Sequence, residues 1–120
     1  EDYFQQYARA YDHFDAVNVA TFFHLPCFIV RFDSVTLLQT SQAVQDYVTS
    51  LINDYREQGY HHRLISHLNA ESLGRNTVFV TVDWSIKRID NSTILNFQNS
   101  YNLTKHRDDW KILVSSRHDL

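Results

Sequence analysis

Three long runs of alternating hydrophobic and polar residues occupy the C-terminal part of the chain, at residues 76–89, 93–105 and 110–118. Alternation with a period of two over such lengths is typical of half-buried β-strands. Short polar segments separate the runs, so we expect a meander of antiparallel strands, with the more weakly alternating residues 60–73 as its first strand. The apolar face of such a sheet must be covered, and the N-terminal half of the chain has to supply the cover.

The N-terminal half instead shows apolar residues at steps of three and four, which predicts amphipathic helices. One helix is expected over residues 3–23, and it should stop ahead of Pro26. A second is expected within residues 40–59, opened by a Thr-Ser cap and closed by a glycine. Between the helices, residues 27–39 predict a small hairpin that turns at Asp33-Ser34.

Composition and charge narrow the class of protein. With 120 residues the chain fits one domain, and 43% hydrophobic with 21% charged residues is ordinary for a globular protein. The net charge is −3 and the basic residues are scattered, so we expect no nucleic-acid partner. No apolar run approaches the ~20 residues that span a bilayer, so no membrane partner is expected. The single cysteine, Cys27, excludes an internal disulfide and favours a cytoplasmic location; because the chain lacks an initial Met, a trimmed N-terminus is also expected.

The order helix, hairpin, helix and meander, together with three short segments, resembles the nuclear transport factor 2-like superfamily. The segments are Val80-Thr81-Val82-Asp83-Trp84, Tyr101-Asn102-Leu103 and Trp110-Lys111-Ile112. The SnoaL-like and ketosteroid-isomerase-like branches are the most similar. The resemblance implies one SnoaL-like domain over residues 1–120 with an α+β, cystatin-like fold, in which a bent antiparallel sheet forms a cone around the N-terminal helices. It also implies a ligand pocket at the open end of the cone and a homodimer formed through the sheet.

Strand parity predicts which side chains line such a cone. The residues expected to face inward are His62, Leu64, Ser66 and Leu68 on the first long strand, Val78, Val80, Val82, Trp84 and Ile86 on the second, Leu95, Phe97, Asn99, Tyr101 and Leu103 on the third, and Trp110, Ile112, Val114, Ser116 and His118 on the last. On the last strand Lys111, Ser115 and Arg117 are expected to face outward.

Polar residues on an apolar inner face are the candidates for chemistry, because burying them unpaired costs roughly 1–3 kcal/mol. A carboxylate beside an imidazole can act as a general acid/base pair, which makes Asp15 with His118 or His62 the catalytic candidate. The alternative is that Asp15 and His118 are simply exposed. The residues expected to line the ligand site are Tyr11, Phe14, Phe23, Phe28, His62, Trp84, Asn99, Tyr101 and His118.

The ketosteroid isomerases of the superfamily combine a helix Tyr with two carboxylic acids in an apolar cavity. Tyr11 can occupy the Tyr position. Asp33 falls in the hairpin turn, however, and Asp83 has the parity of the outer face, so the resemblance does not carry isomerase chemistry onto these residues.

Metal and cofactor motifs are not expected to contribute. The seven His residues fit no HxxxH spacing, and there is no CxxC pair or Gly-rich phosphate loop. Cys27 lies in an apolar stretch, which favours a small buried hydrophobe over a nucleophile. We therefore expect no metal and no cofactor.

Two functions remain open. The first is a small-molecule-binding domain whose pocket inside the cone takes a small apolar ligand, as an isomerase, dehydratase or cyclase would. The second is a non-catalytic dimerisation or protein-interaction domain with an apolar outer face, to which Phe79 and Leu113 would contribute. A closed pocket with converging polar groups would favour the first.

Overall fold

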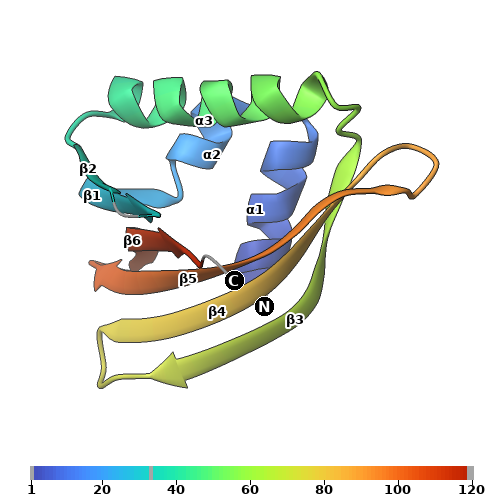
Figure 1. Cartoon of the computed structure of the whole chain (residues 1–120). Coiled ribbons are helices and arrows are strands. Elements are labelled where there is room, and N and C mark those ends of the chain that lie inside the picture. The colour runs from blue at the N-terminus through green and yellow to red at the C-terminus, as the bar shows by residue number, and fades with distance from the viewer. Residues whose placement is uncertain (1, 33, 119–120) are drawn as a thin grey trace.

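The computed structural model describes residues 2–32 and 34–118. Its elements are α1 (Asp2–Asp12), α2 (Ala16–Ala20), β1 (Phe23–Arg31), β2 (Ser34–Leu38), α3 (Ser41–Arg56), β3 (His62–Ser72), β4 (Thr77–Lys87), β5 (Thr93–His106) and β6 (Asp109–Arg117). The strands form one curved, open sheet in the order β2-β1-β6-β5-β4-β3, with α1 against its concave side and α3 crossing above it (Figure 1). The α+β class and the bent sheet expected from the sequence are confirmed.

The N-terminal segment contains two helices where one long helix was expected over residues 3–23. α1 ends at Asp12, Phe14 adopts a left-handed φ of 57°, and Asp15 caps α2 by accepting a hydrogen bond from the Asn18 N–H at 3.1 Å. An Asp side chain competes for backbone N–H groups, so it favours a helix start over a helix interior. None of the helices described here is long and apolar enough to cross a membrane.

The sheet joins the small hairpin to the meander through a parallel pairing of β1 with β6, in which Phe23 lies opposite Ile112 and Val30 opposite Ser116. The sequence predicted both parts but not this junction. In the expected hairpin turn, Asp33 lies outside the described residues. α3 begins as expected, because the Thr40 hydroxyl accepts a hydrogen bond from the Ala43 N–H at 3.1 Å.

Two β-bulges change which side chains face the concave side of the sheet. The β3–β4 register shifts between Ile65 and His67, and the β5–β6 register places Leu103 opposite Ile112 but Asn102 opposite Val114. Each bulge leaves one extra residue unpaired, Ser66 and Leu113 respectively, and so reverses the alternation of every residue beyond it.

The bulges correct the predicted parity over part of each strand, whereas Leu68, Trp110 and Ile112 face inward as predicted. On β6 Ser115 and Arg117 face inward, whereas Val114, Ser116 and His118 face outward. On β3 Arg63 and Ile65 face inward, whereas His62 and Leu64 face outward. The inward residues predicted for β4 and β5 agree with the structure, since Val80, Val82, Trp84, Ile86, Tyr101 and Leu103 are buried.

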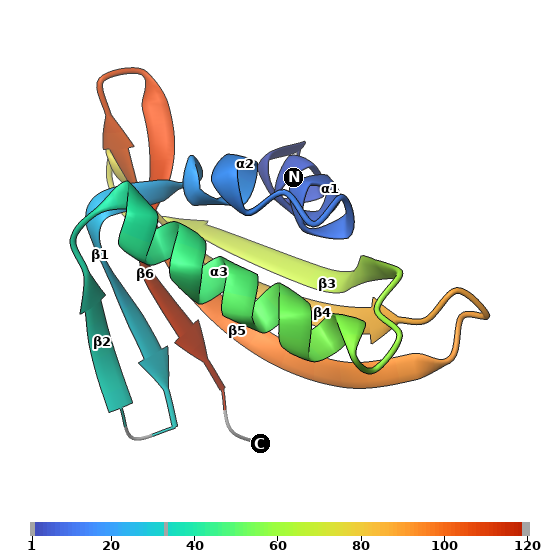
Figure 2. The same ribbon diagram turned by 90° about the horizontal axis from the view of Figure 1, so that it is seen from above.

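The core lies between α1 and the concave face of the sheet. Phe4 and Tyr7 of α1 pack against Trp84 of β4 and Tyr101 of β5, with 4.7 Å between the ring centroids of Phe4 and Tyr101. Trp84 Nε1 donates a hydrogen bond to the Tyr101 hydroxyl at 2.9 Å. α3 instead packs against α2 and passes over the sheet (Figure 2).

Candidate functional site

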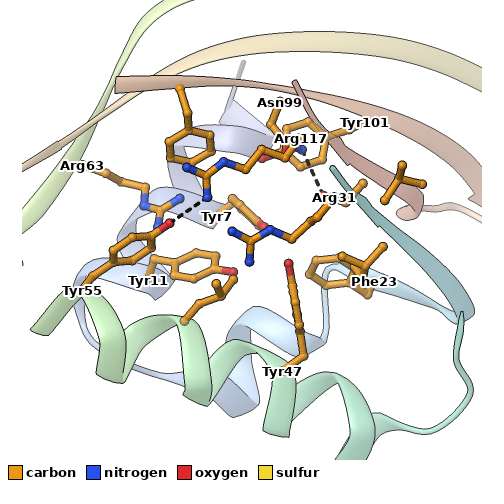
Figure 3. A pocket seen from close by; sticks show the side chains of 15 residues that line it. Tyr7, Tyr11, Phe23, Arg31, Tyr47, Tyr55, Arg63, Asn99, Tyr101 and Arg117 are labelled. Atoms are coloured by element: carbon orange, nitrogen blue, oxygen red, sulfur yellow. Dashed lines mark hydrogen bonds between the residues drawn. The ribbon is translucent and has the colours of Figure 1, made fainter. Parts of the chain in front are cut away.

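A cavity lies beneath α3, between that helix and the concave face of the sheet. Its free space is about 40 Å³, and since one water needs roughly 10–15 Å³ by this measure, about three waters fit. The space increases to about 450 Å³ when the mouth that opens to solvent is included. The lining residues are Tyr7 and Tyr11 from α1, Phe23, Ile29, Val30 and Arg31 from β1, Tyr47, Leu51 and Tyr55 from α3, Arg63 from β3, Phe97, Asn99 and Tyr101 from β5, and Ser115 and Arg117 from β6 (Figure 3).

Three arginines, Arg31, Arg63 and Arg117, turn their guanidinium groups toward this cavity (Figure 3). Among the described residues that line the cavity, none is Asp, Glu or His. The cavity lining therefore carries three positive charges and no carboxylate, although the chain as a whole carries a net charge of −3. Burying positive charge is costly unless polar groups or a counter-charge replace the water that is removed.

Arg63 is only 6% exposed, and its side chain is contacted on several sides. Its Nε donates to the Tyr60 hydroxyl at 3.2 Å, and its guanidinium lies 4.0 Å from the centroid of the Tyr11 ring and 5.0 Å from that of Trp84. Asp12 fixes the surrounding backbone, since its Oδ1 accepts from the Arg63 N–H at 3.0 Å and from the Tyr60 hydroxyl at 2.8 Å. These contacts orient the charge before any ligand arrives.

Arg31 and Arg117 are neighbours across the parallel β1–β6 pair. The register places Val30 opposite Ser116, so the next residues of the two strands bring two like charges side by side. Arg117 has weak support, with Nη1 3.5 Å from the Tyr55 hydroxyl and the guanidinium 4.5 Å from the Phe97 centroid. Arg31 Nε is buried and makes no hydrogen bond. Like charges directly opposite each other destabilise a sheet, so an acidic group between Arg31 and Arg117 would be stabilising.

The tyrosines of the site act as hydrogen-bond donors. Burial raises the pKa of Tyr7, Tyr11, Tyr47 and Tyr101 above the ordinary value for a phenol, because the charged phenolate would lose its water. Their hydroxyls therefore stay protonated at neutral pH. With three arginines, the lining supplies positive charge and donors, which suits the recognition of an anion.

The predicted ligand-site residues divide into two groups. Tyr11, Phe23, Asn99 and Tyr101 line the cavity. The others lie elsewhere: Trp84 supports Arg63 from within the core, Phe14 packs on Tyr60 with centroids 5.5 Å apart, and Phe28 is 39% exposed on the outer face of β1.

The candidate catalytic residues are not brought together. Asp15 is exposed and caps α2. His62 lies on the outer face of β3, where its Nδ1 is 2.9 Å from that of His61. His118 is also on the outer face, with Nε2 2.6 Å from the Ser100 Oγ. The pairing of Asp15 with His118 or His62 is thus not formed, because the bulges turn both imidazoles away from the cavity.

Sequence reasoning missed the arginines, for reasons that differ between them. Arg31 carried a usable signal, since it continues the inward parity of Cys27 and Ile29 at the end of an apolar strand. Arg63 and Arg117 carried none, because the bulges that turn them inward depend on strand pairing.

Cys27 takes no part in the site. Its side chain is fully buried, and burial raises the pKa of the thiol to about 11. The thiol therefore stays protonated at neutral pH and packs as a hydrophobic group. Within residues 2–32 and 34–118 there is also no cluster of three or more His, Cys, Asp or Glu side chains that could hold a metal ion.

Comparison with known proteins identifies the family and the fold. Residues 1–120 match the sequence profile of a family described as NTF2-like protein (DUF6841). An NTF-2 like protein of unknown function from Shewanella oneidensis MR-1 is similar at TM-score 0.76 and 12% identity, covering 98% of this chain and 94% of that one. Aln2 from a Streptomyces species gives TM-score 0.76 at 11% identity, covering 98% of this chain and 85% of that one.

A third solved structure, a putative calcium/calmodulin dependent protein kinase II association domain from Xanthomonas campestris, gives TM-score 0.72 at 9% identity, covering 98% of this chain and 82% of that one. No curated protein matches the sequence. Identities this low establish a shared fold and nothing about shared ligands.

Proposed function

Since the chain belongs to the NTF2-like family that it matches from residue 1 to residue 120, we propose that it uses the space enclosed by this fold to bind a small organic anion. The observation that carries the proposal is the convergence of Arg31, Arg63 and Arg117 on one cavity whose described lining holds no carboxylate. We propose a ligand with an acidic group, whereas the small apolar ligand expected from the sequence stays a prediction. Membership of the SnoaL-like branch and a cytoplasmic location stay predictions.

An anion would relieve the electrostatic strain of the site. Opposite charges 4 Å apart attract by about 4 kcal/mol at an effective dielectric constant of 20. Arg31 and Arg117 lie side by side and Arg31 Nε lacks a partner, so an acidic group between them gains charge-assisted hydrogen bonds and screens their repulsion.

The remaining lining suits the carbon skeleton of such a ligand. Phe23, Ile29 and Leu51 contribute apolar surface, and the aromatic rings of Tyr7 and Tyr47 add flat walls. Ligand sites commonly combine a mainly apolar lining with a few oriented polar groups. An isomerase, dehydratase or cyclase needs a proton acceptor near neutral pH, and the described lining residues supply donors instead, so binding is the function that the site supports best.

We expect anions to stabilise the protein against heat. A ligand at 100 times its Kd adds about 2.7 kcal/mol to the free energy of unfolding, which corresponds to a rise of at least ~5 °C in the unfolding midpoint. The measurement is thermal unfolding with aromatic carboxylates, sulfonates and phosphate esters, each compared with potassium chloride at equal ionic strength. If no organic anion exceeds the effect of chloride, the proposal is wrong.

Two arginine variants give this experiment a matched control. Arg117→Gln removes one positive charge from the cavity and should cut the ligand-induced shift at a fixed anion concentration by at least half. Arg75→Gln removes the same charge from the exposed β3–β4 turn and should leave the shift unchanged. If both variants lose the same share of the ligand-induced shift, the shift reflects the overall charge of the protein and not a specific site.

The second candidate function, dimerisation through the sheet, is favoured by a different surface. On the outer face Leu37, Phe28 and Val114 form a row across β2, β1 and β6, and Leu37 and Phe28 are 43% and 39% exposed. The outer face of β4 and β5 is polar by contrast, with the Gln98 amide donating to Asp83 Oδ1 at 2.8 Å. An exposed apolar row next to a polar surface is typical of an interaction site, so we propose that a homodimer would form at the β1–β2 end of the sheet.

Light scattering after gel filtration should then give a mass of twice the 14.2 kDa chain. Phe28→Asp should shift the protein to the monomer, because a dimer would bury the new carboxylate in the apolar contact. Val17→Asp changes another exposed apolar residue, on α2 and 61% exposed, and should leave the mass unchanged. A monomeric wild-type protein would contradict the dimer.

A further inference from the structure

The arrangement of charges and donors in the cavity favours one class of acidic group over others. We infer that its ligand carries a phosphate monoester, a tetrahedral group with a double negative charge, in preference to a planar carboxylate. This inference rests on the proposed function, because it names the chemical class of the anion in the same cavity.

The three arginines reach the cavity from two distant parts of the sheet. β3 and β6 are separated by β4 and β5 in the sheet, so their backbones lie about 14 Å apart at the usual ~4.8 Å strand spacing. Arg63 and Arg117 nevertheless point toward a common space, which Arg31 enters from the β1 side (Figure 3). A carboxylate offers two oxygens in one plane, whereas a phosphate monoester presents three terminal oxygens in three directions. Two guanidinium groups from the adjacent strands β1 and β6 and a third from β3 match three terminal oxygens better than two.

The three arginines also supply more donors and more positive charge than a carboxylate can use. An arginine carries five N–H donors, and a carboxylate has about four lone-pair sites. Arg31 and Arg117 place two positive charges side by side. Arg63 adds a third positive charge on a side chain that is only 6% exposed. A phosphate monoester carries about −1.5 to −2 at neutral pH, so it balances more of this charge than a carboxylate can.

Size supports the same ligand. The free space of about 40 Å³ accommodates a group of a few heavy atoms, and the mouth beyond it leaves room for the ester substituent among the aromatic side chains. Phosphate sites made from Gly-rich loops use backbone N–H groups. This site uses side-chain guanidinium groups, so the absence of a Gly-rich phosphate motif from the sequence does not conflict with it.

Calorimetric titration of the wild-type chain at neutral pH tests the inference with three ligands that share one ring: phenyl phosphate, phenyl sulfate and benzoate. Phenyl phosphate should bind at least tenfold more tightly than benzoate. Phenyl sulfate has the tetrahedral shape with a single charge and should fall between them. Inorganic phosphate is titrated in parallel. If it binds as tightly as phenyl phosphate, the site is assigned to the free ion. If it binds more weakly, the site is assigned to the ester.

The pH dependence provides an independent readout. The second pKa of a phosphate monoester is about 6. The groups that face the cavity are Arg31, Arg63 and Arg117 and the hydroxyls of Tyr7, Tyr11, Tyr47, Tyr55 and Tyr101. The reference pKa values of arginine and tyrosine side chains lie well above pH 7.5. The affinity for phenyl phosphate should therefore rise as the pH increases through 6, while the affinity for benzoate, which is already ionised, stays flat.

The outcomes separate this inference from the proposed function. If benzoate binds as tightly as phenyl phosphate, the phosphate assignment is overturned and anion binding stands. If none of the ligands binds, both are overturned. In Arg117→Gln the preference for phenyl phosphate over benzoate should fall below threefold, and in Arg75→Gln it should persist; an unchanged preference in Arg117→Gln would also overturn the assignment.

Discussion

Replacing Trp84 with Ala should lower the free energy of unfolding by about 3–5 kcal/mol, which is a large share of the ~5–15 kcal/mol that stabilises a typical domain. Trp84 is 1% exposed, and its Nε1 donates to the Tyr101 hydroxyl. Its ring also lies 5.0 Å from the Arg63 guanidinium. The substitution therefore opens a cavity beneath α1, removes a buried hydrogen bond and loosens an arginine of the anion site. Urea denaturation followed by far-ultraviolet circular dichroism measures the loss.

Two further variants separate the contributions of the Trp84 ring, its hydrogen bond and its position in the core. Trp84→Phe keeps a ring in place but removes the donor to the Tyr101 hydroxyl, so it should cost about 1–3 kcal/mol. Trp110→Ala removes the second tryptophan, which is only half-buried, and should cost less than Trp84→Ala. If Trp84→Ala and Trp110→Ala cost the same, the core is not centred on Trp84.

Arg31→Met should have opposite effects on stability and on binding. Without ligand, Arg31 stands beside Arg117 and its Nε is buried without a partner. An apolar side chain of similar length removes both the repulsion and the unsatisfied donor, so the free energy of unfolding should rise by about 1–2 kcal/mol. Hydrogen bonds to charged groups contribute about 1.5–3 kcal/mol, so the anion affinity should fall at least tenfold.

The two effects are measured by urea denaturation of the ligand-free protein and by titration with phenyl phosphate. Arg75→Met, in the exposed β3–β4 turn, should change neither quantity appreciably. A drop in the stability of ligand-free Arg31→Met would show that Arg31 already has a structural counter-charge, and it would remove the main electrostatic argument for an anion site. The stability gain should also shrink at high salt, because salt screens the repulsion between Arg31 and Arg117.

Features that depend on neighbouring residues were predicted correctly more often than features that depend on distant ones. The start of α3 depends on Thr40, whose side chain bonds three residues ahead, and the β4 parity depends on alternation within one strand. Both were predictable from neighbouring residues. The break between α1 and α2 was also local, at Phe14 and Asp15, but the apolar stripe that continues past it concealed the cap.

The candidate site was less predictable because its parts are distant in the chain. Tyr11, Phe23, Asn99 and Tyr101 were identified as lining residues, since aromatic and amide side chains on inward positions follow from parity. The histidines were misplaced because the parity was extended across bulges that the sequence does not mark.

The sequence by itself determined the meander, the capped α3 and the hairpin, because period-two alternation, a Thr cap and turn residues act over a few positions. Only the tertiary structure decided that β1 pairs with β6, that bulges at Ser66 and Leu113 reverse the parity, and that three arginines separated by 32 and 54 residues meet in one cavity. The physical reason is that a bulge forms against a partner strand, so the direction of Arg63 and Arg117 depends on residues far away in the chain.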